Sequence, residues 1–170
     1  MALASQYGVI TDEGIELVPA YLRFLRGVID SADLPLNISR ETLQKSPVLD
    51  KIRDSVTNRV LTELKKRGEK DPAEYAQFWD NFGAVIKEGL CESTAPRDKI
   101  LETCRFYTNT SSGQLINLAD YKSRMKEGQE AIYFLTGDTL ESLEHSPQIE
   151  AFTKRGIEVL DGPNGSSWRR

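Results

Sequence analysis

The chain has 170 residues, of which 39% are hydrophobic and 28% are charged, and its formal net charge at pH 7 is −4. This length allows one ordinary domain or two small ones. The sequence has neither a run of about 18 apolar residues nor a charged segment followed by an apolar one at its start, which argues against a membrane span and a secretory signal. The acidic balance argues against a nucleic-acid partner, because such a partner requires a basic face. We therefore expect a globular, cytoplasmic protein that binds neither nucleic acid nor membranes.

The cysteine and histidine content argues against a zinc site and against a disulfide framework. Cys91 and Cys104 do not have CxxC spacing, and the single histidine, His145, lies far from both in the sequence. We expect reduced, half-buried thiols and no bound metal.

The N-terminal part of the chain mixes strand and helix patterns. Residues 7–11 predict a short strand, and apolar residues at helical spacing predict a helix over residues 15–25. Gly27 interrupts this pattern, and the β-branched Val28 and Ile29 predict a second short strand.

A long amphipathic helix is predicted next. Ser46 and Pro47 are typical of a helix start, with serine as the cap and proline in the first turn. Apolar residues then recur every three or four positions, so the helix should run to about Lys66, and Gly68 is expected to end it.

Two further helices follow. Asp71 and Pro72 predict the start of the second, with Glu74 placed as in a capping box. Its apolar stripe is rich in aromatic residues: Tyr75, Phe78, Trp79, Phe82, Val85 and Ile86. At helical spacing such a stripe favours a core face over an exposed client-binding surface. A shorter third helix is expected to begin near residues 94–96, and the three apolar stripes indicate helices packed on one another.

After Cys104 the pattern changes to short strands and helices. The apolar run over residues 131–135 predicts a strand covered on both faces. A helical stretch over residues 139–152, interrupted at Ser146 and Pro147, separates it from a strand over residues 157–160, which implies a parallel pair with a right-handed crossover. Residues 105–107 form a further candidate strand, 111–113 a loop, and Leu118, Tyr121 and Met125 a short helix. The sequence therefore predicts an α/β fragment, then a helical spacer, then a small α/β unit.

The stretch Asp33–Gln44, written DLPLNISRETLQ, has the properties of an ordered loop. Pro35 favours extended backbone before it, and Asn37 and Ser39 are side chains that hold turns. If a helical turn begins near Ser39, Arg40 and Gln44 lie four residues apart on one face.

Arg40 has two interpretations from pattern alone. An arginine and a glutamine on one face can together bind a phosphate, since the guanidinium provides a charged fork and the amide a neutral donor. The more common alternative is that Arg40 pairs with Glu41 or a neighbouring carboxylate on a solvated surface.

A family resemblance bears on this choice. The stretch Leu22–Gln44 resembles the middle domain of the ninety-kilodalton heat-shock chaperones (the heat shock protein 90 family), and the chain is similar to its bacterial, HtpG-type branch. The resemblance runs from about Val9 to Leu160. It continues through Tyr75–Trp79, Ser112–Leu115, Tyr121–Gly128, Ala131–Gly137 and His145–Pro147.

The resemblance implies a role for the loop. It implies an ATP-driven homodimeric chaperone whose chain has an N-terminal ATP-binding domain, this middle domain and a C-terminal dimerisation domain. Arg40 would then be the catalytic-loop arginine that contacts the ATP γ-phosphate, Gln44 the glutamine beside it, and Asn37 the asparagine that helps to hold the loop. ATP and Mg would belong to the full-length protein, and none is expected in this fragment, which would not be an enzyme alone. Client proteins, and possibly other chaperones, would be its partners.

The resemblance also divides the chain. Residues 1–6 are expected to be a leader or cloning-derived, residues 7–45 the end of the large middle subdomain, and residues 46–103 a helical linker. Residues 104–160 would form a small αβα subdomain with a parallel strand pair, and residues 161–170 an appended tail. The fold class expected is α/β, or α+β by layout. Thr42 stands where methionine or leucine is common, Ala32 stands where glutamate is common, and the residues before Val9 fit the family poorly.

Three function classes remain from the sequence. The first is a chaperone module that couples ATP hydrolysis elsewhere to client folding. The second is a non-catalytic helical adaptor, which requires an exposed apolar groove on the middle helices. A stand-alone enzyme ranks third, because the sequence shows no nucleophile, acid/base pair or cofactor loop. Arg124 and Lys126 favour a plain surface role over contact with an acidic partner.

Overall fold

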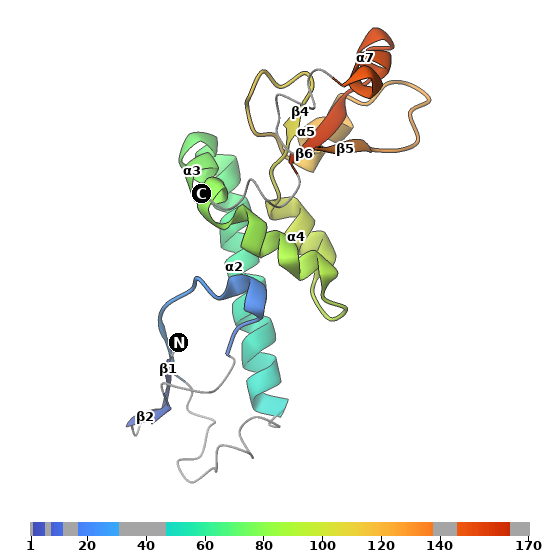
Figure 1. The fold of residues 1–170 in the computed structure, drawn as a ribbon. Coiled ribbons are helices and arrows are strands. Elements are labelled where there is room, and N and C mark those ends of the chain that lie inside the picture. The colour runs from blue at the N-terminus through green and yellow to red at the C-terminus, as the bar shows by residue number, and fades with distance from the viewer. Residues whose placement is uncertain (1, 6–7, 12–16, 31–46, 138–145, 164–170) are drawn as a thin grey trace.

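The computed structural model describes residues 2–5, 8–11, 17–30, 47–137 and 146–163, and the structural statements below refer to these ranges. The architecture mixes helix and sheet. A group of helices around the long helix α2 lies between two small three-stranded sheets, one near each end of the molecule (Figure 1). None of the helices in these ranges is long and apolar enough to cross a membrane.

The N-terminal sheet has the strand order β2-β1-β3. Its strands are β1 (Ala2–Ser5), β2 (Gly8–Thr11) and β3 (Val28–Asp30). Strand β1 runs antiparallel to β2 and parallel to β3. Strands β2 and β3 confirm the two predicted strands, whereas β1 occupies residues that the sequence analysis left without structure.

A single 3-10 turn, η1 (Ala20–Leu22), lies between β2 and β3. The prediction of a helix over residues 15–25 is therefore wrong for residues 17–25, the part of this range that the structure describes. The apolar periodicity reflects burial instead, because Leu17, Tyr21 and Leu22 are 3% exposed or less.

Helix α2 (Pro47–Lys70) starts at the predicted proline but continues through Gly68. The predicted end at Gly68 is wrong. A glycine inside a helix costs about 1 kcal/mol relative to alanine, and here Gly68 is buried beneath the side chains of Arg105 and Tyr75. The helix ends where Asp71 and Pro72 begin the next one.

Helices α3 (Pro72–Glu88) and α4 (Arg97–Thr103) confirm the other two predictions, with the 3-10 turn η2 (Gly89–Cys91) between them. Asp71 caps α3, since its carboxylate accepts a hydrogen bond from the Glu74 amide at 2.9 Å.

The main core lies where these helices meet. Tyr75, Trp79 and Ile86 are 3% exposed or less, so this part of the aromatic stripe is core, as predicted. The stripe's other two rings, Phe78 and Phe82, are half-buried, and Phe24 packs against both. The buried members of the core are Tyr21, Leu22, Leu61, Leu64, Tyr75, Trp79, Ile86, Ile100 and Cys104.

The C-terminal sheet has the order β4-β6-β5. Its elements in chain order are β4 (Tyr107–Thr108), α5 (Leu118–Ser123), β5 (Tyr133–Gly137), α7 (Pro147–Lys154) and β6 (Val159–Pro163). Strands β5 and β6 are parallel, which confirms the predicted pair, and β4 is antiparallel to β6. Strand β6 continues beyond its predicted end at Leu160. The part of the predicted helix before residue 146, and His145, lie outside the described residues.

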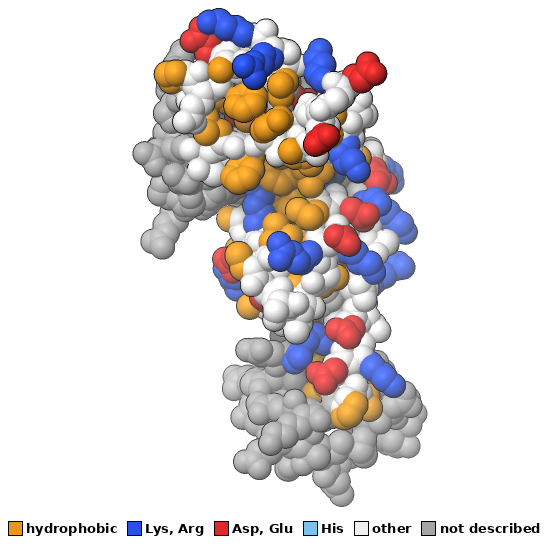
Figure 2. All heavy atoms as spheres, turned by 90° about the vertical axis from the view of Figure 1, so that its right-hand side faces the viewer, with side chains coloured by type: hydrophobic (Ala, Val, Ile, Leu, Met, Phe, Trp, Pro, Cys, Tyr) orange, Lys and Arg blue, Asp and Glu red, His pale blue; other side chains and the backbone are white. Residues whose placement is uncertain are grey.

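Strand β5 differs from the prediction in its burial. Phe134 is 72% exposed and Ile132 is 37% exposed, so the expectation of a strand covered on both faces is wrong. The strand lies at an edge of its sheet, and a hydrophobic run does not by itself distinguish an edge strand from a central one. Figure 2 shows hydrophobic side chains gathered on the upper part of one face, at the end of the molecule that carries this sheet.

Candidate functional site

The three residues predicted to act on ATP, Arg40, Gln44 and Asn37, all lie in residues 31–46, outside the described ranges. Their roles therefore stay predictions. The structure does describe the two elements that flank this segment: β3, which ends at Asp30, and α2, which begins at Pro47.

The chain before the segment is fixed to α3. Arg23 forms a two-pronged ion pair with Glu88, with N–O distances of 2.5 and 2.9 Å. Because both side chains are about half exposed, this pair orients the chain more than it stabilises the fold. The burial of Tyr21 and Leu22 and the packing of Phe24 provide the hydrophobic part of the attachment.

The chain after the segment is fixed to α4 through α2. Leu49 and Leu61 of α2 are buried. Two polar contacts join the helices: Lys99 Nζ donates to Asn58 Oδ1 at 2.7 Å, and Lys65 lies 3.2 Å from Glu102. Residues 21–24 and helix α2 are therefore attached to one group of packed helices, whereas β3, which directly precedes residues 31–46, pairs with β1.

Arg105 is a buried cation at the junction between these helices and the C-terminal sheet. Its Nη1 donates to the carbonyls of Thr103 and Cys104 at 3.2 and 3.0 Å, at the end of α4, and its guanidinium lies 4.6 Å from the centre of the Tyr75 ring. The Tyr75 hydroxyl also donates to the Thr103 carbonyl, at 2.9 Å. Burial lowers the pKa of Arg105 from its ordinary value. These contacts join α3 to the end of α4.

Lys87 and Cys104 lie beside this junction. The Lys87 ammonium lies 4.7 Å from the centre of the Phe106 ring and 5.5 Å from that of Trp79, and burial lowers its pKa. Burial also raises the pKa of the Cys104 thiol, to about 11, even though Lys87 and Arg105 act in the opposite direction. A thiol with so high a pKa is a poor nucleophile at neutral pH, so this group is structural. Cys104 is fully buried and Cys91 is exposed, whereas both were expected to be half-buried.

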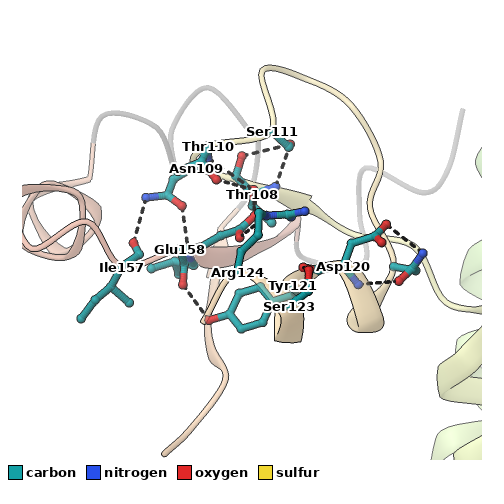
Figure 3. Close-up of polar contacts among 12 residues, drawn as sticks. Thr108, Asn109, Thr110, Ser111, Asp120, Tyr121, Ser123, Arg124, Ile157 and Glu158 are labelled. Carbon is teal, nitrogen blue, oxygen red and sulfur yellow. Dashed lines mark hydrogen bonds and ion pairs between the residues drawn. The ribbon is translucent and has the colours of Figure 1, made fainter. Parts of the chain in front are cut away.

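A second polar group lies in the C-terminal sheet, around Glu158 (Figure 3). Arg124 makes two hydrogen bonds of 2.9 Å to the Glu158 carboxylate, and the Thr108 hydroxyl adds a third at 2.8 Å. Burial raises the pKa of Glu158, but the hydrogen bonds from Arg124, Thr108 and Thr110 together lower it below the usual value. Arg124 therefore has a structural role, which differs from the plain surface role predicted for it.

The neighbours of Glu158 complete the connection between β4, α5 and β6. The Tyr121 hydroxyl donates to the Glu158 carbonyl at 2.6 Å, and the Asn109 side chain accepts from the Val159 amide at 2.9 Å (Figure 3). Every charged group in this network is paired, which is typical of a structural site.

The described part of the chain holds two networks of buried polar contacts, one around Arg105 and one around Glu158. Among the residues that the structure describes, no three metal-ligating side chains come together. The sequence analysis missed the Arg105 junction, although a glycine within an otherwise helical pattern is a signal for close packing. It also missed the Arg124 and Glu158 pair, whose partners are 34 residues apart in the sequence.

Comparisons with known proteins identify the relatives of this chain. The family described as Hsp90 protein matches residues 6–161. The chaperone protein HtpG of Ehrlichia canis is 57% identical over 153 residues, and that of Anaplasma marginale is 57% identical over 154 residues. The HtpG of Roseobacter denitrificans is 57% identical over 151 residues. Each match covers 89% of this chain and 24% of the relative, so the chain spans about a quarter of the length of these proteins. The extent of the family match, together with this identity, shows that the chain belongs to the Hsp90 family.

Proposed function

We propose that this chain is the C-terminal portion of the middle domain of an ATP-dependent chaperone of the HtpG type. In this proposal its residues 31–46 form the catalytic loop that acts on ATP held by another domain. The observation that carries the proposal is the family match over residues 6–161, a range that includes this segment. The attachment of residues 21–24 and of α2 to one helical group supports it, because a loop that must meet a ligand in another domain requires a firm base.

Each of the three loop residues has a defined role in this proposal. Arg40 donates its guanidinium N–H groups to the γ-phosphate oxygens, where negative charge is stabilised as the terminal phosphoryl group is transferred. Gln44 lies one helical turn further on and provides a neutral donor on the same side. Asn37 holds the loop through hydrogen bonds to nearby backbone groups.

The rest of the proposal concerns the whole protein. In this proposal ATP and Mg bind in the N-terminal domain of the full-length protein, and these 170 residues supply the loop that acts on them. The full-length protein is a cytoplasmic homodimer that folds client proteins, and closure of its domains delivers the loop to the nucleotide. This chain would contact the N-terminal and C-terminal domains of its own polypeptide.

The experiment is a substitution in the full-length parent protein. Arg40→Ala should lower the ATP turnover rate by a factor on the order of 10² or more, because a preorganised donor to transition-state charge is lost. ATP affinity should change little, since most nucleotide contacts belong to the other domain. Arg59→Ala is the matched control, as this arginine lies on the exposed surface of α2 in a pair with Glu63. Unchanged turnover in Arg40→Ala would exclude the proposed role.

The alternative function, a helical adaptor that binds a partner through the middle helices, receives no support from the burial of α3. Tyr75, Trp79 and Ile86 of the stripe face the core and are not available to a partner. We therefore retain the chaperone function as the proposal.

A further inference from the structure

A second candidate binding site lies between α2, α4 and α5, at the junction that Arg105 occupies. A pocket of about 320 Å³ opens there. Its wall includes Glu69 of α2, Leu101 and Glu102 of α4, Leu118 and Ala119 of α5, and Arg105 itself. Because these helices are separate in the sequence, the pocket is formed by the packing of the fold and not by one helix face.

Arg105 is a buried cation without a carboxylate partner. It is 6% exposed, and it forms no ion pair with a carboxylate in the ranges that the structure describes. Glu102, which lines the same pocket, pairs with Lys65 instead, at 3.2 Å. A buried charge is usually paired, because its removal from water costs free energy. The carbonyls at the end of α4 and the Tyr75 ring offset part of this cost, but they provide no negative charge.

The guanidinium also has an unused edge. All of its hydrogen bonds, to the carbonyls of Glu102, Thr103 and Cys104, come from Nη1. Within the described part of the chain Nε and Nη2 have no acceptor, yet neither belongs to the atoms that are sealed from solvent. Because Arg105 lines the pocket, these two atoms are donors that a ligand in the pocket can reach.

We propose that this pocket binds a carboxylate carried on an apolar group. The Nε and Nη2 edge of a guanidinium matches the two oxygens of a carboxylate in a two-pronged hydrogen bond. Leu101, Leu118 and Ala119 provide apolar surface for the attached group. Glu69 and Glu102 disfavour a phosphate, because their carboxylates repel a second negative charge. The ligand is thus a monocarboxylate, either a small free acid or the C-terminus of a polypeptide. This inference is independent of the proposed catalytic loop.

The first test is a titration of this 170-residue chain, labelled with ¹⁵N, with isocaproate. The matched control ligand is isocaproamide, which has nearly the same shape without the charge. We expect the Arg105 Nε–H and Ala119 amide resonances to shift with the acid, and the amide to bind about tenfold more weakly or less, since a charged acceptor is lost. Equal affinity for acid and amide would overturn the proposal.

A second pair of ligands, N-acetyl-alanyl-leucine and its C-terminal amide, distinguishes the two sources of the carboxylate. Binding of this peptide acid in preference to isocaproate supports a polypeptide C-terminus, and the reverse supports a small free acid. If neither acid shifts the Arg105 Nε–H resonance, the pocket binds no carboxylate and the proposal fails.

The third test uses variants that leave Arg105 in place. Ala119→Phe puts a ring into the pocket wall and should weaken binding of the preferred acid by about fivefold or more, because the ring takes the volume that the ligand needs. Ala73→Phe, at an exposed position of α3 outside the pocket, is the matched control and should leave the affinity unchanged. Glu69→Gln should leave the urea midpoint of the free chain unchanged. A lower midpoint would mean that Glu69 itself pairs with Arg105, and it would contradict the proposal.

Discussion

Replacing Gly68 with alanine tests how Arg105 packs against α2. A Cβ atom at residue 68 would lie 2.0 Å from Arg105 Nη2 and 3.2 Å from Tyr75 Cδ1. The end of an arginine usually moves away from such a clash at little cost. Arg105, however, is 6% exposed and is held by the carbonyls of Thr103 and Cys104. Moving the guanidinium therefore breaks these hydrogen bonds.

The expected loss follows from these contacts. A hydrogen bond from a charged donor contributes about 1.5–3 kcal/mol, and the two bonds share one nitrogen, so their joint loss costs about 2–4 kcal/mol. Alanine recovers about 1 kcal/mol because it favours the helix more than glycine does. We expect Gly68→Ala to lower the free energy of unfolding by about 1–3 kcal/mol.

A double-mutant cycle separates the two effects. The free energy of unfolding is measured by urea titration for the wild type, Gly68→Ala, Arg105→Ala and the double variant, with helical circular dichroism as the signal. In the Arg105→Ala background only Tyr75 Cδ1, at 3.2 Å, stays close to the new Cβ atom, so Gly68→Ala should then stabilise by up to about 1 kcal/mol. If Gly68→Ala stabilises the wild-type chain by the same amount, the higher helix preference of alanine alone determines the change in the free energy of unfolding. That result would refute the proposed packing role of Arg105.

Three further predictions concern other parts of the chain. The hydrogen bonds to Glu158 hold its folded pKa below the usual value, so they stabilise the fold above about pH 4.3, and this stabilisation is lost as the pH falls through the lower folded pKa. In Glu158→Gln the urea midpoint should therefore fall less than that of the wild type between about pH 5 and 3. An unchanged pH profile would contradict the pairing with Arg124. Iodoacetamide at pH 8 should modify exposed Cys91 and leave Cys104 intact in the native chain, because burial raises the pKa of Cys104 to about 11; mass spectrometry that finds both labelled equally would argue against that burial. Asp71→Ala should lower the free energy of unfolding, measured by urea titration, by about 1 kcal/mol, since α3 loses its cap. No change would show that water satisfies the Glu74 amide as well as the Asp71 carboxylate does.

The sequence predicts those features that local chemistry determines. Asp71 precedes Pro72 and caps the helix that begins there, as predicted, whereas Ser146, predicted only to interrupt a helical stretch, caps the helix that begins at Pro147. The parallel pairing of β5 and β6 follows from the order strand, helix, strand, because a parallel pair requires a crossover. The burial of Trp79 follows from helical spacing.

Features determined by distant residues were not predictable in this way. Whether Gly68 ends a helix or continues it depends on Arg105, which packs there from another part of the fold. The exposure of Phe134 depends on the position of β5 at a sheet edge, which its hydrophobic run does not encode. Strand β1 is the central strand of its sheet, and one of its two partners, β3, comes more than twenty positions later in the sequence. The family resemblance predicted the relatives correctly because it compares the whole chain at once.

The central claim is that Arg40 acts on the γ-phosphate of ATP bound in another domain, and single-turnover hydrolysis tests it most directly. The full-length parent protein and its Arg40→Ala variant are loaded with γ-labelled ATP, and the rate constant for phosphate release is compared with the separately measured ATP dissociation constant. The account predicts that the rate constant falls by a factor on the order of 10² or more while the dissociation constant stays within about threefold. An unchanged rate constant, or a loss confined to ATP affinity, would contradict it.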